Sequence, residues 1–342
     1  MRVAVIGAGS WGTALALVLA EAGHEVVLWA RTPEVARAIN EEHRNPRYLS
    51  DYRLPSAIRA TADYACACEG AEAVVIVTPS AALRSVAADL RELIAPGTPI
   101  VICSKGVEEK TGLLPIDTFA AELGNAGRMA VLSGPTHAEE VGRHLPSAIV
   151  AASKEQQAAE LVQQLFMNAR FRVYTSSDVV GAELGAALKN VIALCAGISD
   201  GMGFGDNTRA MLMTRGLTEI ARLGVALGGR KDTFTGLAGV GDLIVTCTSM
   251  HSRNRRAGIL IGQGKTPEQA MAEVGAVVEG YYAARAGPPA GRPLERELPI
   301  TAAAYRVLYE GADVSQTVTQ LLCREKRAET EDASWDSHGN CS

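Results

Sequence analysis

Residues 3–22 read VAVIGAGSWGTALALVLAEA, a short apolar run followed by a glycine-rich turn and an alanine- and leucine-rich segment. Val3–Ile6 is typical of a buried strand, and Thr13–Ala22 has the composition of a helix. Between them stands Gly7-Ala8-Gly9-Ser10-Trp11-Gly12, in the spacing G-x-G-x-x-G. The first glycine permits a tight turn, the second lets the backbone approach a pyrophosphate, and the third allows the helix to pack on the strand. The segment therefore predicts a dinucleotide-binding unit.

Apolar runs rich in valine and isoleucine recur through the first half of the chain. They are Val26–Trp29, Ala73–Val77, Ile100–Cys103, Met129–Leu132, Ala148–Ala151 and, as a further strand near an edge, Phe171–Tyr174. Continuous apolar strands separated by helical stretches are typical of a parallel sheet that is covered on both faces. The fold class that follows is α/β, a Rossmann-like, doubly wound, mostly parallel sheet.

From about Val179 the strand-like runs give way to long segments rich in Ala, Leu and Met. We expect helices at Gly181–Ala196, Thr208–Leu227, Thr266–Val274 and Thr301–Leu308. The predicted organisation is a dinucleotide-binding domain at 1–178, an all-α substrate-binding and catalytic domain at 179–325, and a polar tail at 326–342 that is expected to be disordered. The large apolar helical part makes a homodimer plausible.

The overall charge and hydropathy exclude several classes of protein. Lys and Arg number 33 against 38 Asp and Glu, a formal net charge of −5, which argues against a nucleic-acid partner. No run approaches the ~18 apolar residues of a membrane span. The glycines and Glu21 interrupt the apolar start of the chain, which argues against a signal peptide. We expect a soluble protein without membrane insertion.

Cysteine and histidine do not form metal sites in this sequence. The seven cysteines are an odd, scattered set without metal-ligand spacing, which favours a reduced, cytoplasmic setting. His137 and His144 are seven residues apart and His251 stands alone, so we interpret all three as structural. No metal is expected.

The end of the second predicted strand bears on which nucleotide is bound. A ribose-binding acid is expected ~20 residues after the glycines, but the chain there reads Leu28-Trp29-Ala30-Arg31-Thr32. Arg31 can pair with a 2′-phosphate, which favours NADP, while NAD is not excluded. The alternative is that Arg31 simply begins a solvated helix.

Lys189 is the only charged side chain between Glu183 and Asp200. A helix that is apolar on all sides is a buried helix, so this lysine needs a cleft or a partner, unless it extends its amine into water. Burial lowers a lysine pKa from about 10.4 toward the range that suits proton transfer. Asn190, beside it, suits a hydrogen bond to a hydroxyl or carbonyl. Lys189 is the candidate catalytic residue.

Two other segments suit a phosphorylated small molecule. Ser252-Arg253-Asn254-Arg255-Arg256 combines Arg and Asn donors, although such a run is also typical of a solvated surface. Asp242, in Gly239-Val-Gly-Asp-Leu243, could hold a hydroxyl or position a lysine. Ser104-Lys105-Gly106 follows the strand Ile100–Cys103, at the edge where open α/β sheets bind ligands.

Together these pieces resemble the NAD(P)-dependent glycerol-3-phosphate dehydrogenase family of the bacterial type, up to about residue 325. The resemblance rests on GAGSWGTALA (7–16), SKG (104–106), SGPTHAEEV (133–141), GAALKNVIALCAGISDGMGFGDNTRA (185–210), GLAGVGDL (236–243) and SRNRRAG (252–258). It implies reversible reduction of dihydroxyacetone phosphate to sn-glycerol 3-phosphate, which supplies the backbone of membrane phospholipids.

The resemblance also implies roles for individual residues, with Lys189 as the proton donor and acceptor. The implied substrate contacts are Lys105, Gly134, Thr136, Asp242, Ser252, Arg253 and Asn254. The implied nucleotide contacts are Ser10, Trp11, Arg31, Tyr48, Lys105, Ala138, Arg253, Val277 and Glu279. One departure from the family is Ala286-Gly-Pro-Pro-Ala-Gly-Arg-Pro293, because adjacent prolines cannot continue the helix that relatives have there.

Two alternatives stay open at this point. A related hydroxyacid or ketopantoate-type dehydrogenase would reduce a carboxylate-bearing substrate, which Arg253 could also bind. A non-catalytic NADPH-sensing module would bind the nucleotide without turnover, but it has no need of a lone lysine in an apolar helix.

Overall fold

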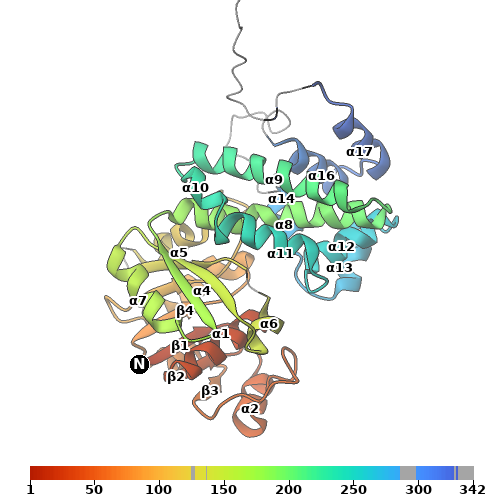
Figure 1. Cartoon of the computed structure of the whole chain (residues 1–342). Helices are drawn as coiled ribbons and strands as arrows, with labels where there is room; N and C mark the ends of the chain where they lie inside the picture. The colour runs from red at the N-terminus through yellow and green to blue at the C-terminus, as the bar shows by residue number, and fades with distance from the viewer. Residues whose placement is uncertain (125–127, 136, 286–297, 327–328, 330–342) are drawn as a thin grey trace, which may run out of the picture.

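The structure is a computed structural model that describes residues 1–124, 128–135, 137–285, 298–326 and 329. Figure 1 shows a sheet with its flanking helices in one half of the molecule and a group of helices in the other. The first half contains β1 (Arg2–Ile6), α1 (Ser10–Glu21), β2 (Glu25–Trp29), α2 (Pro33–Glu42), β3 (Ile58–Thr61), α3 (Tyr64–Cys68), β4 (Ala73–Ile76), η1 (Ser80–Ala82), α4 (Leu83–Leu90), β5 (Ile100–Ile102), α5 (Pro115–Leu123), β6 (Met129–Ser133), α6 (Ala138–Gly142), β7 (Ser147–Ala152), α7 (Gln156–Phe166) and β8 (Phe171–Ser176).

The described residues of the second half form helices joined by loops, with no strand among them. It contains α8 (Val179–Gly201), α9 (Asp206–Ala226), α10 (Lys231–Phe234), the π-helix η2 (Leu237–Gly241), α11 (Asp242–Thr248), α12 (Arg253–Gly262), α13 (Pro267–Val274), α14 (Glu279–Arg285), α16 (Pro299–Tyr309) and α17 (Val314–Leu322). The helices predicted in this half are confirmed within a few residues at each end. The glycine-rich stretch 236–241 follows α10 and not a strand.

The eight strands form one sheet in the order β3-β2-β1-β4-β5-β6-β7-β8. Every neighbouring pair is parallel except β6 and β7. The mostly parallel, Rossmann-like sheet predicted from the sequence is confirmed, and Phe171–Tyr174 lies in β8 at one edge, as expected. The sequence analysis missed β3, the strand at the opposite edge.

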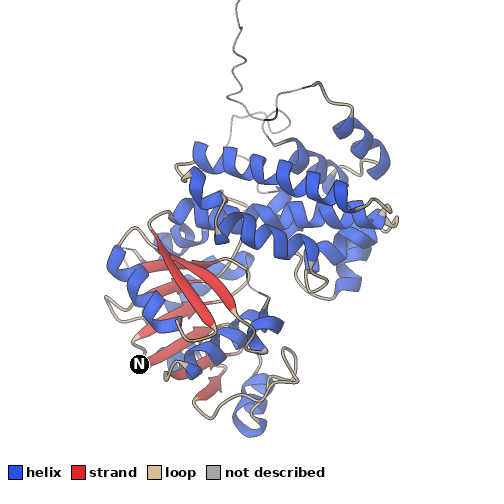
Figure 2. Ribbon diagram, viewed as in Figure 1, coloured by secondary structure: helices blue, strands red, loops and turns tan. Residues whose placement is uncertain are grey.

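The sheet is covered on both faces, as Figure 2 shows. Val3 and Val5 of β1 point into a core that they share with α1, α2, α6 and α7. Ala4 and Ile6 point into the opposite core, which is formed with α3, α4, α5 and the start of α8. This alternation is the period of two expected of a strand, and both sets are apolar because both faces are buried. The sheet is therefore doubly wound.

Helix α8 runs through the centre of the helical half (Figure 1). Asp178 caps its N-terminus by accepting a hydrogen bond from Gly181 N. Within the described part of the chain, α8 is the one helix long and apolar enough to cross a membrane, but 89% of its most apolar window is buried inside the protein. It is packed by α9, α11, α12 and α14. Lys189 is therefore carried by the core helix of this half.

Two expectations fall largely or wholly outside the described residues. The proline-containing segment 286–293 lies in the gap between α14 and α16, so its effect on this part of the fold stays a prediction. Most of the tail 326–342 is likewise undescribed.

Candidate active site

The glycine turn between β1 and α1 has the geometry that its sequence predicts. Gly7 has φ +128°, and a Cβ there would lie 2.6 Å from the carbonyl oxygen of Val77. A Cβ at Gly12 would lie 1.8 Å from the carbonyl oxygen of Gly7, so the close packing of helix on strand depends on this glycine. At Gly9, by contrast, a Cβ would meet nothing within 4 Å. The space in front of Gly9 is where a pyrophosphate would approach the backbone.

Two buried polar atoms beside this turn fit a bound nucleotide. The indole Nε1 of Trp11 and the hydroxyl of Thr78 are buried, and neither has a hydrogen-bond partner among the described residues. Thr78 lies two residues after the end of β4, against Gly7. Buried polar groups are rarely left unpaired, and a ligand is one explanation when they line a binding turn. The residues present therefore fit a dinucleotide.

The residues expected at the other end of the nucleotide lie after β2 and on the loop that follows α2. Arg31 is exposed two residues after the end of β2. Tyr48 is 42% exposed and donates its backbone N–H to Oδ1 of Asn45. The amide of Asn45 donates in turn to the carbonyl of Ala8 and to the hydroxyl of Thr13. This buried asparagine, which the sequence analysis did not single out, ties the Tyr48 loop to the glycine turn.

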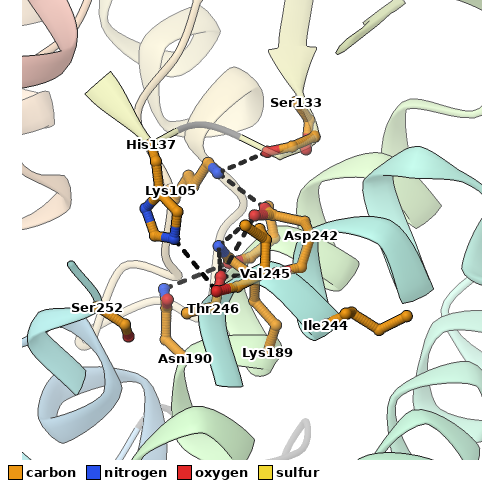
Figure 3. Close-up of polar contacts among 12 residues, drawn as sticks. Lys105, Ser133, His137, Lys189, Asn190, Asp242, Ile244, Val245, Thr246 and Ser252 are labelled. Carbon is orange, nitrogen blue, oxygen red and sulfur yellow. Dashed lines mark hydrogen bonds and ion pairs between the residues drawn. The ribbon is translucent and has the colours of Figure 1, made fainter. Parts of the chain in front are cut away.

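The centre of the candidate site is a cluster of two lysines and one carboxylate, in which Lys189 and Asp242 are buried and Lys105 is partly buried (Figure 3). Lys189 Nζ lies 2.5 Å from Oδ1 of Asp242, and Lys105 Nζ lies 2.8 Å from Oδ2 of the same carboxylate. Lys189 also donates to the hydroxyl of Thr246 at 2.7 Å. The side chain of Lys189 is 6% exposed and that of Asp242 is 1% exposed. Lys189 is therefore not extended into water, and that alternative is wrong.

The charges of the cluster perturb one another. Burial lowers the pKa of Lys189 to about 7; Asp242 opposes this shift and Lys105 adds to it. Burial alone would raise the pKa of Asp242, but the two lysines hold it below its usual value. A buried carboxylate between two amines therefore stays ionised, while Lys189 can gain or lose a proton near neutral pH.

The loop after β6 reaches the same cluster. Lys105, on the loop after β5, donates to the carbonyl of Gly134 at 3.1 Å. Gly134 has φ +145°, and a Cβ there would lie 3.2 Å from the side chain of Ile149, so a side chain would be strained and crowded. Ala138 is buried at the first position of α6. Thr136 lies outside the described residues.

A second set of contacts joins α8, α12 and α14. Asn254 donates through Nδ2 to Oδ1 of Asn190 at 2.9 Å and accepts the backbone N–H of Gly280 at 2.8 Å. Glu279, the residue before Gly280, accepts a hydrogen bond from the hydroxyl of Ser80, which follows β4. Asn190 and Asn254, both predicted as site residues, are thus in direct contact. Val277 lies just before α14 and is 41% exposed.

The residues of the basic run 252–256 have different roles in the structure. Ser252 is buried and caps α12 by accepting the backbone N–H of Arg255. The guanidinium of Arg255 pairs with Asp200 at 2.8 Å, so this arginine links α12 to the end of α8. Arg253 is exposed. The run is therefore neither wholly a solvated surface nor wholly available to a ligand.

The structure brings the candidate residues to one edge of the sheet. Gly7, Arg31, Lys105 and Gly134 follow β1, β2, β5 and β6, whose carboxyl ends share an edge because these strands are parallel. Sequence reasoning missed Thr246, although its spacing of four residues from Asp242 on α11 places the two on one helix face.

His137, which the sequence analysis interpreted as structural, lies beside the lysine cluster (Figure 3). Its Nε2 lies 3.1 Å from the carbonyl of Val245 on α11, and Lys189 is close enough to affect its pKa. A single histidine in the sequence Gly134-Pro135-Thr136-His137 gives no signal for such a position.

Comparisons with known proteins agree on one family. A family model described as "NAD-dependent glycerol-3-phosphate dehydrogenase N-terminus" matches residues 2–159, and the corresponding C-terminus model matches residues 178–319. The chain is 51% identical over 333 residues to a glycerol-3-phosphate dehydrogenase [NAD(P)+] of Moorella thermoacetica, covering 97% of this chain and 99% of that protein. A protein of the same name from Desulfitobacterium hafniense is 50% identical, with 97% and 94% covered. The crystal structure of glycerol-3-phosphate dehydrogenase from Coxiella burnetii is similar with a TM-score of 0.89 and 41% identity, over 94% of this chain and 99% of that one.

Proposed function

The chain belongs to the NAD-dependent glycerol-3-phosphate dehydrogenase family, and on this premise we propose that the Lys105–Asp242–Lys189 cluster is the site of its proton transfer. The enzyme is an oxidoreductase that uses NADP or NAD to interconvert dihydroxyacetone phosphate and sn-glycerol 3-phosphate. Its product is the backbone of glycerophospholipids. The observation that carries the proposal is the buried Lys189 amine, held by Asp242 at the sheet edge that bears the glycine turn.

Lys189 acts as the general acid in the direction of reduction. When bound at the glycine turn, NADPH would supply the hydride that the ketone carbon accepts. The Lys189 ammonium gives a proton to the ketone oxygen as it becomes an alkoxide, and the neutral amine takes that proton back in the reverse direction. With its pKa near 7, Lys189 has both forms available at neutral pH. Lys105 adds positive potential beside the developing negative charge, and Asp242 holds both amines in place.

The substrate phosphate is assigned to the loops that flank the cluster. Arg253 supplies an exposed charge at the start of α12, and Ser252 and Asn254 fix that start from buried positions. Gly134 and Thr136 complete the set, as expected from the family. Binding energy from this remote group orients the carbonyl toward Lys189. Asn190, held by Asn254, lies beside the reacting end.

The nucleotide is assigned to the glycine turn and its neighbours. Gly7, Gly9 and Gly12 allow the backbone to approach the pyrophosphate, and Ser10 and Trp11 begin the helix that faces it. Arg31 pairs with a 2′-phosphate, which makes NADP the preferred cofactor, and NAD the weaker one. The remaining nucleotide contacts are Tyr48, Lys105, Ala138, Arg253, Val277 and Glu279.

The proposal extends to organisation and setting. The dinucleotide-binding domain ends at residue 178, next to the start of α8, and the substrate domain follows at 179–325. The six described cysteines are all free thiols, which fits a reduced, cytoplasmic setting. We also propose a homodimer, to be tested by light scattering of the purified protein.

An absorbance assay at the nicotinamide band tests the function. The purified enzyme is given dihydroxyacetone phosphate, ketopantoate or a 3-hydroxyacid, each with NADP(H) and NAD(H) in turn. The proposal predicts NADPH oxidation with dihydroxyacetone phosphate and little turnover of the carboxylates. Preferential turnover of ketopantoate would favour the hydroxyacid alternative. Nucleotide binding without turnover of any candidate would favour the sensing module.

A further inference from the structure

The imidazole of His137 joins two parts of the site, and the proposed chemistry gives it no role. His137 is the residue that precedes α6, and its Nε2 lies 3.1 Å from the carbonyl oxygen of Val245 on α11 (Figure 3). A carbonyl oxygen can only accept a hydrogen bond, so Nε2 carries the hydrogen and donates. In the neutral ring Nδ1 is then an acceptor. This fixes the tautomer of His137 by its contact.

The surroundings of the ring keep it neutral at and above neutral pH. Burial lowers the pKa of His137 below 6.5; the bond to Val245 opposes this and Lys189 adds to it. Glu139 and Glu140 of α6 act in the opposite sense to Lys189. The ring of His251, from the loop before α12, lies with its centroid 5.8 Å from that of His137.

The position of Val245 on α11 connects this hydrogen bond to the residues that hold Lys189. Val245 lies on α11 between Asp242 and Thr246, the two residues that hold Lys189. On the facing side, His137 belongs to the loop whose Gly134 accepts a hydrogen bond from Lys105. The loop therefore contacts Lys105 at its start and α11, the helix that carries Asp242, at its end.

We propose that His137 is a positioning residue, whose hydrogen bond to Val245 holds α11 against the loop after β6 so that Asp242 stays in contact with Lys189. The proposal rests on the proposed function for its effect on turnover. Its effect on the protonation of Lys189 is independent of any substrate. Because Asp242 favours the ammonium form, a loosened α11 makes Lys189 lose its proton at lower pH.

The test compares three variants of the full-length enzyme. His137→Phe keeps a ring of similar size but removes the donor, and His137→Gln keeps a donor. His24→Phe is the matched control, because His24 Nε2 also lies 3.1 Å from a backbone carbonyl, that of Leu165. The protonation of Lys189 is followed by NMR of labelled lysine side chains, assigned with Lys189→Met. In parallel, kcat/KM for dihydroxyacetone phosphate is measured across pH, together with the Kd of NADPH.

We expect His137→Phe to lower kcat/KM at about pH 7 by about 2- to 5-fold, because a smaller fraction of Lys189 is then protonated. Its Lys189 titration moves to lower pH by about 0.5–1 unit, while the Kd of NADPH is unchanged. His137→Gln and His24→Phe behave like the wild type. If His137→Phe fails to fold, His137→Asn, whose side chain is too short to reach Val245, takes its place with the same expected results.

An unmoved Lys189 titration in the donor-less variant overturns the inference, whether or not kcat/KM falls. A shift of the same size in His137→Gln overturns it as well, because the donor would then be irrelevant. A wild-type enzyme without activity on dihydroxyacetone phosphate would contradict the proposed function instead, and the titration would still decide the role of His137.

Discussion

Replacing Asp242 with asparagine removes the carboxylate that lies 2.5 Å from Lys189 Nζ and 2.8 Å from Lys105 Nζ, while the side chain keeps its size. Asp242 favours the Lys189 ammonium, and burial and Lys105 oppose it. An opposite charge at contact distance typically shifts a pKa by about 1–3 units, so loss of Asp242 lowers the Lys189 pKa by about 2 units from its value near 7.

The size of the activity loss then depends on pH. With a pKa near 7, wild-type Lys189 is about 99% protonated at about pH 5 and about half protonated at about pH 7. In the variant, about half of Lys189 is protonated at about pH 5 and about 1% at about pH 7. In the proposed mechanism, reduction of dihydroxyacetone phosphate needs the Lys189 ammonium. The expected deficit in kcat/KM is therefore about 2-fold at about pH 5, about 50-fold at about pH 7 and near 100-fold above that.

The assay is NADPH oxidation with dihydroxyacetone phosphate from pH 5 to pH 9, with Asp89→Asn as the control because Asp89 is an exposed carboxylate on α4. A deficit of the same size at every pH would refute the reasoning. It would mean that Asp242 serves the fold or the substrate but does not maintain the charge of Lys189.

The other predictions concern the nucleotide and the stability of the fold. Arg31→Ala should raise KM for NADPH by about 10-fold with little change for NADH, since one charge-assisted contact is lost; equal effects on both would contradict the role of Arg31. Gly9→Ala should fold normally and bind NADPH weakly, whereas Gly12→Ala should lower the melting temperature, because only the second Cβ meets backbone at 1.8 Å. Burial raises the pKa of Glu183 from 4.5 to about 8, so the folded state keeps a proton that the unfolded state loses, and stability falls as pH rises through this window. Glu183→Gln should reduce this loss of stability, by about 1.4 kcal/mol per pKa unit. The free energy of unfolding is measured with urea at pH 5 and pH 8, and an equal change between the two pH values in both proteins would argue against this.

Most of the sheet could be predicted because its strands are continuous apolar runs. Two features could not. Ile58-Arg59-Ala60-Thr61, which forms β3, is four residues long and has an exposed arginine, so it does not resemble the buried strands. The antiparallel pairing of β6 with β7 is also absent from the sequence pattern, since an apolar run reads the same whichever way its neighbour runs.

The candidate site shows the same limit. Lys189 was predicted from its isolation in an apolar helix, and Asp242, which was suggested to position a lysine, contacts it in the structure. That Asp242 contacts both Lys189 and Lys105 could not be predicted. Asp242 is separated in the sequence from Lys189 by 53 positions and from Lys105 by 137 positions. The contact of His137 with Val245 spans 108 positions and is equally invisible in the sequence.

The most direct test of the account is Lys189→Met, which keeps most of the buried volume and removes the amine. Steady-state reduction of dihydroxyacetone phosphate is measured beside NADPH binding by fluorescence. The account predicts that kcat falls by about 10²–10⁴-fold, the usual contribution of a general acid, with the Kd of NADPH close to that of the wild type. Wild-type turnover by this variant would show that the proton comes from elsewhere.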